Sequence, residues 1–169
     1  PYIKRNLKDK DNTTILPTDL GGAKRANYYS TYLNTDVAFA YKVRNYRKKN
    51  TVQDLKIMGN IKNRTVYIVD DMIDTGGTFC KAVEIAKESG AKEIIGVTTF
   101  ALLNGEAIER LNTLYKSGKF SKLICTDATY IPKEVLNENK WIKVITVSKY
   151  FGEIIYRLNT RHSIGSLLD

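Results

Sequence analysis

The stretch from residue 66 to residue 79 constrains this chain more than any other, and it reads V-Y-I-V-D-D-M-I-D-T-G-G-T-F. Residues 66–69 are β-branched or aromatic, which predicts a short buried strand. Asp70 and Asp71 stand at the end of that strand, and Asp74 precedes a Thr-Gly-Gly-Thr turn that leads into a helical pattern. A strand, an acidic corner, a glycine turn and a helix together predict an anion site at a helix N-terminus.

The three carboxylates decide what kind of anion such a site can take. On their own they would repel a phosphate, so we expect them to hold a divalent cation or the hydroxyls of a sugar that carries the phosphate. The alternative is a plain strand-to-helix turn, but a helix cap needs only one acidic or hydroxyl residue. The pattern therefore favours a phosphate site with a metal or a sugar beside it.

The rest of the chain alternates between strand and helix patterns. The expected strands are residues 13–16, 37–41, 66–69, 93–99, 122–126 and 141–147, with a strand-like piece at 52–59. The expected helices end near Leu33 and near Gly90, begin near Gly105, and run from a Ser148 cap to about Leu158. This alternation predicts an α/β fold with a mostly parallel twisted sheet flanked by helices on both faces. We expect one domain over residues 1–169, in which residues 1–12 are a polar surface lead-in.

Composition argues against several classes of function. The chain is 43% hydrophobic and 27% charged, and no apolar run approaches the roughly 18 residues of a membrane span. His162 is the only histidine, which argues against histidine-based acid–base chemistry and against a histidine-rich metal site. Cys80 and Cys125 form no framework or metal pattern, as expected of reduced core thiols in a cytoplasmic protein.

The net charge of +9 would suit a nucleic-acid partner. However, aromatic residues do not alternate with the densest basic cluster, residues 42–49, as they do on a stacking platform for bases. A small anionic substrate explains the charge equally well. We therefore expect no nucleic-acid partner and no membrane partner.

The stretch at 66–79 resembles the phosphoribosyl diphosphate loop of the type I phosphoribosyltransferase fold. The form D-D-M-I-D-T-G-G-T is closer to one branch, the ribose-phosphate diphosphokinase (phosphoribosyl diphosphate synthetase) family. P-T-D-L-G-G-A-K-R-A at 17–26 resembles the family's P-D-x-G-G-x-x-R-A with one residue inserted, and T-D-A-T-Y-I-P at 126–132 resembles its T-D-T-I-P. Phe100 and Asn104 depart from the pattern, because the family often has His and Ser there. The resemblance runs from about residue 13 to residue 169.

The resemblance implies a role for each residue of the central loop. Asp70 and Asp71 would hold the ribose hydroxyls or the magnesium attached to them. The residues that would cradle the 5-phosphate are Asp74, Thr75, Gly76, Gly77 and Thr78. Asp19, in the 17–26 segment, would be associated with magnesium and the ribose, and the alternative for it is a turn-forming Asp before two glycines.

A basic loop follows the second expected strand and resembles the family's catalytic flexible loop. The family's K-R-R is K-V-R here, with Val43 in the middle position. Lys42 and Arg44 would then neutralise charge on the transferred group while the closed loop excludes water. The alternative is a solvated basic loop without a catalytic role.

The function that the resemblance implies is that of the C-terminal half of a ribose-phosphate diphosphokinase. Such an enzyme transfers a diphosphate from Mg-ATP to the anomeric hydroxyl of ribose 5-phosphate, so Mg²⁺ and ATP are implied, and the full-length protein would be a homo-oligomer. Because the family's N-terminal domain is absent from these residues, we expect the isolated chain to bind sugar phosphate with little or no turnover. Two alternatives stay open, a phosphoribosyltransferase that consumes phosphoribosyl diphosphate and a regulatory homologue without catalysis.

Overall fold

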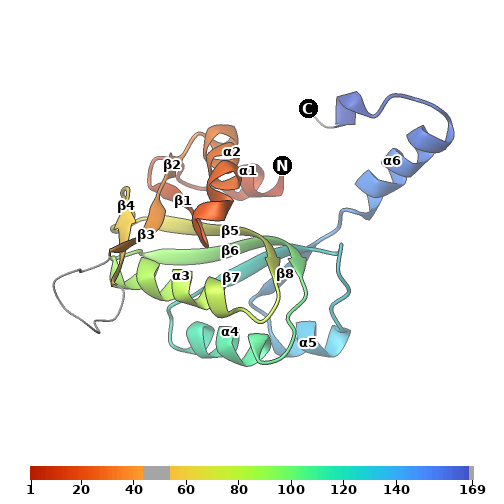
Figure 1. Ribbon diagram of the computed structural model, residues 1–169. Coiled ribbons are helices and arrows are strands. Elements are labelled where there is room, and N and C mark those ends of the chain that lie inside the picture. The colour runs from red at the N-terminus through yellow and green to blue at the C-terminus, as the bar shows by residue number, and fades with distance from the viewer. Residues whose placement is uncertain (44–53, 168–169) are drawn as a thin grey trace.

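The computed structural model describes residues 1–43 and 54–167 (Figure 1). The main sheet has the strand order β2-β1-β5-β6-β7-β8, and every neighbouring pair in it is parallel. Its strands are β1 (Thr13–Pro17), β2 (Asp36–Val37), β5 (Thr65–Ile73), β6 (Glu93–Ala101), β7 (Lys122–Thr126) and β8 (Ile142–Ile145). A separate two-stranded sheet pairs β3 (Phe39–Val43) with β4 (Asp54–Met58) in antiparallel orientation.

Helices cover both faces of the main sheet (Figure 1). They are α1 (Tyr2–Asn6), α2 (Ala23–Leu33), α3 (Gly77–Glu88), α4 (Ala107–Lys116), α5 (Lys133–Glu138) and α6 (Ser148–Asn159), with short 3₁₀ turns η1 (Leu20–Gly22) and η2 (Gly165–Leu167). Residues of α3, α4 and α5 share one hydrophobic core with the sheet, and residues of α1 and α2 share the other. The predicted α/β fold, a mostly parallel sheet with helices on both faces, is therefore confirmed.

The core under α3 is built around Phe79, which is only 2% exposed. Gly96 of β6 leaves the space for its ring, since a Cβ at Gly96 would lie 2.6 Å from Phe79 Cζ and 2.9 Å from Leu123 Cδ1. Burying a phenylalanine side chain stabilises a fold by roughly 1.5–3 kcal/mol. This contact anchors α3 on the sheet near its first turn.

The central strand β5 is longer than predicted. Residues 66–69 are buried, as expected for a strand covered on both faces. The strand then continues past Asp70 and Asp71 to Ile73, and its last residues pair with Phe100 and Ala101 of β6. The prediction that the two aspartates stand at the end of the strand was wrong, because ladder pairing with β6 extends the strand through them.

The strand predicted at 37–41 is two strands, because the chain leaves the main sheet at Ala38. The Ala38 amide donates to the carbonyl oxygen of Ile15 at 2.8 Å. Gly59 packs closely on this bend, and its φ of +117° is one that glycine tolerates best. A Cβ at Gly59 would lie 2.7 Å from the Ala38 Cβ, so the β3–β4 pair depends on this glycine.

Two helices and two boundaries also differ from the prediction. The polar lead-in over residues 1–12 contains α1, and the sequence pattern did not predict α5. The last strand, predicted at 141–147, is the shorter β8. Ser148 is the first residue of α6 rather than its cap, and Val147 is the N-cap residue.

Helix α6 extends away from the body of the sheet and its covering helices (Figure 1). The apolar residues Phe151, Ile155 and Leu158 fall at helical spacing and are 50%, 63% and 59% exposed. The apolar stripe of α6 is therefore not buried within the described part of this chain. Among residues 1–43 and 54–167, no helix is both long enough and apolar enough to cross a membrane.

Candidate functional site

The acidic residues of the central stretch meet the segment that follows β1. Strands β1 and β5 are parallel neighbours, with Pro17 opposite Val69, so Thr18 just beyond β1 lies beside Asp70 in the last part of β5. Thr18 Oγ1 donates a hydrogen bond of 2.7 Å to Asp70 Oδ2. In open parallel sheets this carboxyl-end edge is where ligands bind, so the two predicted halves of the site are brought together.

Arg25 of α2 reaches across to both aspartates. Its Nη1 lies 3.3 Å from Asp70 Oδ1, and its Nη2 lies 2.7 Å from Asp71 Oδ2. The Asp70 side chain is 18% exposed, whereas that of Asp71 is 64% exposed. The Arg25 guanidinium therefore forms ion pairs with both the partly buried Asp70 carboxylate and the exposed Asp71 carboxylate.

The two carboxyl groups titrate differently because of this arrangement. Burial raises the pKa of Asp70 above its ordinary value against the hydrogen bond from Thr18, and the neighbouring Asp71 carboxyl adds to the rise. Burial also acts to raise the pKa of Asp71, but hydrogen bonding with Asp70 and the charge of Arg25 outweigh it, so that pKa is lowered. Of the two carboxyl groups, Asp71 therefore has the lower pKa and the more solvent-exposed side chain.

Asp19 lies just beyond β1 and is exposed. Its Oδ1 accepts a hydrogen bond of 3.1 Å from the Gly22 amide, which caps the 3₁₀ turn η1. This is the turn-forming role that was the alternative for Asp19, and its predicted magnesium role stays a prediction. In the described ranges no group of three or more His, Cys, Asp or Glu side chains is arranged to hold a metal ion.

The predicted phosphate cradle is the loop that joins β5 to α3. Gly76 is the N-cap residue of α3 and has φ +76°, a left-handed conformation that favours glycine. The first helical bond runs from the Cys80 amide to the Gly76 carbonyl oxygen at 2.8 Å, and no side chain of the described residues caps the helix. The amides of the first turn, including those of Gly77 and Thr78, therefore keep free hydrogen-bonding capacity at the positive end of the helix dipole.

The hydroxyl-bearing residues of the cradle are placed to add donors. Thr75 and Thr78 are exposed, while Gly76 between them is buried against α4. Arg110 of α4 also lies close, since a Cβ on Gly77 would be 3.3 Å from Arg110 Nη1. Together these groups offer amides, hydroxyls and a nearby cation to an anion.

The sequence did not predict the contact between Asn104 and Asp74. The Asn104 side-chain Nδ2 donates to Asp74 Oδ1 at 2.7 Å, and its backbone amide donates to the Asp74 carbonyl oxygen at 3.1 Å. Thr18 and Arg25 were not singled out either, although Arg25 is the arginine of the 17–26 segment. Nothing in the local sequence pattern pairs residues 30 or more positions apart, so these contacts needed the fold.

The predicted catalytic pair falls at the border of the described residues. Lys42 lies in β3 by its backbone, but its side chain lies outside the described part of the chain. Arg44 also lies outside the described residues. Their catalytic roles stay predictions.

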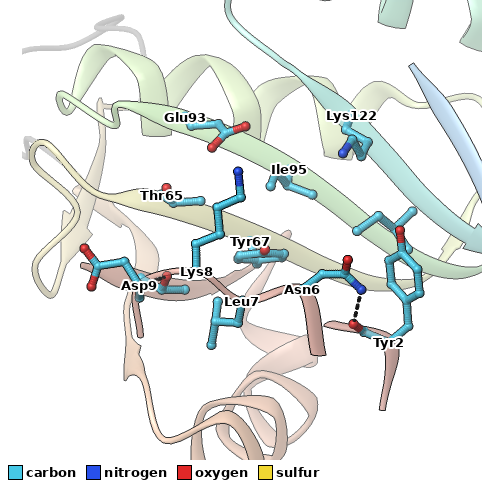
Figure 2. Close-up of a pocket in the computed structure, with 12 residues that line it drawn as sticks. Tyr2, Asn6, Leu7, Lys8, Asp9, Thr65, Tyr67, Glu93, Ile95 and Lys122 are labelled. Atoms are coloured by element: carbon cyan, nitrogen blue, oxygen red, sulfur yellow. Dashed lines mark hydrogen bonds between the residues drawn. The ribbon is translucent and has the colours of Figure 1, made fainter. Parts of the chain in front are cut away.

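A cavity of about 260 Å³ lies at the opposite end of the strands. Figure 2 shows it between α1, the segment after α1 and the first residues of β5, β6 and β7, with Tyr2, Tyr67 and Lys122 among its lining residues. Lys122 and other charged side chains line it at exposed positions. The carboxylates and open amides of the central stretch are not part of it, so the candidate site is the carboxyl-end edge of the sheet.

Comparisons with known proteins identify the family of this chain. Residues 2–130 match the family described as "Phosphoribosyl transferase domain". The chain is 37% identical over 166 residues to the ribose-phosphate pyrophosphokinase of Campylobacter jejuni, covering 98% of this chain and 50% of that protein. It is 34% identical over 165 residues to that of Chlorobaculum tepidum, covering 98% of this chain and 48% of that protein.

Solved structures share the fold. The phosphoribosylpyrophosphate synthetase of Mycobacterium smegmatis matches with a TM-score of 0.80 and 25% identity, covering 95% of this chain and 49% of that one. The APRTase of Giardia lamblia matches with a TM-score of 0.52 and 16% identity, covering 73% of this chain and 74% of that one, which shows the fold alone. This chain spans about half the length of the curated relatives it matches. The chain belongs to the phosphoribosyl transferase domain family, and its relatives include ribose-phosphate pyrophosphokinases.

Proposed function

We propose that this chain binds ribose 5-phosphate as the C-terminal half of a ribose-phosphate diphosphokinase, the same activity as a pyrophosphokinase. The observation that carries the proposal is one continuous segment that holds two kinds of recognition group. Asp70 and Asp71 supply carboxylates at the sheet edge, and a few residues later the open amides of α3 supply donors. A sugar phosphate has hydroxyls that can donate to the carboxylates and a phosphate that can accept from the amides.

Each side of the site has a distinct task in this proposal. The carboxylates of Asp70 and Asp71 accept hydrogen bonds from ribose hydroxyls, while Arg25 and Thr18 hold them in place. The amides and hydroxyls of the cradle, residues 74–78, bind the 5-phosphate at the helix N-terminus. These contacts position the anomeric hydroxyl for in-line attack on the β-phosphorus of ATP, a reaction that depends mainly on positioning and charge stabilisation.

Magnesium fits the oxygen groups on the outer side of the site. Mg²⁺ binds through one or two carboxylates together with water and substrate phosphates, and Asp71 and Asp19 are both exposed carboxylates at this edge. When bound, Mg²⁺ would neutralise charge on the transferred diphosphate. Lys42 and Arg44 are proposed to do the same from the basic loop.

The remaining parts of the activity lie beyond this chain in the proposal. ATP would be bound largely by the other half of a protein about twice this length, as the length of the relatives suggests. We also propose that residues 1–169 form one domain and that the full-length protein is a homo-oligomer. Each of these is part of the proposal and is open to direct test.

The first experiment is calorimetric titration of this chain with ribose 5-phosphate, with and without Mg²⁺, and with ribose as the control. We expect the phosphorylated sugar to bind and ribose not to bind, because the cradle recognises the anion. The isosteric double variant Asp70→Asn with Asp71→Asn should lose sugar-phosphate affinity by about tenfold or more, since two charged acceptors are removed.

The matched control is Asp9→Asn with Asp11→Asn, which removes the same charge before β1, at the other end of the sheet. It should bind ribose 5-phosphate like the parent chain. Equal loss in both double variants would show that net charge, and not the site, governs binding. Failure of the parent chain to bind would overturn the proposal for these residues.

A further inference from the structure

Two segments of this chain begin with the same Asp-x-Gly-Gly pattern at the same sheet edge. One is Asp19 to Gly22 after β1, and the other is Asp74 to Gly77 after β5. In both, an acidic side chain comes three residues before a glycine amide near the start of a helix, Gly22 at the N-cap of α2 and Gly77 at the first residue of α3. An aspartate in this position readily accepts a hydrogen bond from that amide and closes the turn.

The first segment closes in this way and the second does not. Asp19 Oδ1 accepts from the Gly22 amide at 3.1 Å. No side chain caps α3, so the Gly77 amide has no such partner within the described part of the chain. The backbones of the two segments also differ, because Gly76 has φ +76° whereas the matching Gly21 lies in η1 without a left-handed φ. Contacts from outside each segment differ as well.

The outside contact that only the second segment has is with Asn104. Its side-chain Nδ2 donates to Asp74 Oδ1 at 2.7 Å, and its backbone amide donates to the Asp74 carbonyl oxygen at 3.1 Å. Asp19 has no hydrogen-bond donor of this kind among the described residues, since the bonds to it come from the Gly22 amide alone. The Asp74 carboxylate is thus hydrogen-bonded to the loop between β6 and α4.

The loop that carries Asn104 is itself fixed. The amides of Leu102 and Leu103 both donate to the Ile73 carbonyl oxygen, at 3.0 and 3.1 Å. Leu103 has φ +53°, a left-handed conformation that is unusual for leucine. The Asn104 carbonyl oxygen accepts from the Ala107 amide at 3.2 Å, which joins the loop to the start of α4. Asn104 is therefore presented to Asp74 from a backbone anchored at both ends.

We propose that Asn104 is a positioning residue that diverts Asp74 from capping its own turn and so keeps the amides of α3 open for a phosphate. The inference rests on the proposed function and deepens it, because the phosphate is that of ribose 5-phosphate. Without Asn104 the Asp74 carboxylate would compete with the phosphate for the Gly77 amide and would repel it. The bond from Asn104 prevents the competition and offsets part of the carboxylate charge.

The test is a double-mutant cycle in the full 169-residue chain, using Asn104→Ala, Asp74→Ala and the double variant. Asn104 is exposed, so Asn104→Ala is expected to fold normally. Titration with ribose 5-phosphate should show about tenfold weaker binding for Asn104→Ala, the size expected for a hydrogen bond to a charged group. In the Asp74→Ala background the same substitution should change affinity by less than about twofold, because the competitor is gone.

Asn6→Ala is the matched control, since Asn6 is an exposed asparagine whose side chain, among the described residues, bonds only to the Tyr2 carbonyl oxygen within α1. It should leave affinity unchanged. A loss from Asn104→Ala that is equally large in the Asp74→Ala background would overturn the proposal and leave Asn104 a structural residue. Equal binding by the parent and Asn104→Ala would overturn it as well.

A second readout does not need the ligand. Amide hydrogen exchange of Gly77 in the unliganded chain should slow in Asn104→Ala, because Asp74 then accepts from that amide. Unchanged exchange would refute the diversion of Asp74 even if sugar binding had changed. If the parent chain does not bind ribose 5-phosphate at all, the proposed function fails, while this exchange measurement still decides whether Asn104 controls the turn.

Discussion

Replacing Gly76 and Gly77 separately by alanine tests what shapes the phosphate cradle. At Gly76 an added Cβ would meet nothing closer than 3.7 Å, so there is no steric clash and the cost comes from φ +76° alone. A non-glycine residue in that conformation destabilises the folded state by about 1–2 kcal/mol. Alanine also lowers the conformational entropy of the unfolded chain, which stabilises the fold by about 0.4–1 kcal/mol. We expect Gly76→Ala to lower the free energy of unfolding by about 0.5–1.5 kcal/mol.

Gly77→Ala is the matched variant one residue later. Its Cβ would lie 3.3 Å from Arg110 Nη1, the far end of an exposed side chain that can move aside. Gly77 is already helical, and alanine is preferred over glycine in a helix by about 1 kcal/mol. This variant should therefore be neutral or more stable than the parent by up to about 1 kcal/mol.

Urea unfolding followed by the fluorescence of Trp141 measures both free energies. Trp141 is the single tryptophan and is 3% exposed, so its emission reports the loss of the core. The expected order of stability is Gly77→Ala at or above the parent and Gly76→Ala below it. If Gly76→Ala were as stable as Gly77→Ala, the left-handed conformation at the N-cap would not be what forms this turn, and the reasoning would fail.

Two further predictions concern the core that supports the site. Gly96→Ala should lower the free energy of unfolding by about 1–3 kcal/mol through overpacking, because its Cβ would approach Phe79 and Leu123 within 2.9 Å. An unchanged urea unfolding curve would contradict this packing. Burial raises the pKa of the Cys125 thiol to about 11 from an ordinary 9.0. The thiol is therefore protonated at pH 8, and Cys80, which is partly exposed, should react first with a thiolate-specific reagent. Since the raised pKa favours the protonated form in the folded state, this contribution to stability is present below pH 9 and is lost as pH rises through about 11. Reaction of Cys125 as fast as Cys80 in folded protein would contradict the burial.

The parallel sheet and its order of elements were predictable because they depend on the pattern of residue types within each short segment. Residues 66–69 are β-branched or aromatic, and strands that alternate with helices indicate a parallel sheet. The extension of β5 through Asp70 and Asp71 was not predictable in the same way, since aspartate is disfavoured in strands. Pairing with β6, through Met72 opposite Phe100, overrides that preference.

Contacts between distant segments account for the other differences. The bend at Ala38 depends on Gly59, which lies far along the chain, and a pattern of apolar residues cannot show such an approach. Arg25 and Asn104 have side chains that any exposed helix or loop could carry. Their significance appears only when α2 and the β6–α4 loop are placed beside Asp71 and Asp74.

The charges of the site support the proposal that it takes a sugar phosphate rather than either part alone. One end holds two carboxylates, and Arg25 balances only one of their two charges. The other end is the uncapped start of α3, with Arg110 close to Gly77. A free phosphate would meet favourable amides but also the carboxylates a few residues away, and a neutral sugar would leave the amides without an acceptor. A ligand with donor hydroxyls at one end and an anion at the other satisfies both ends, and this requirement follows from the order of residues along a single strand, turn and helix.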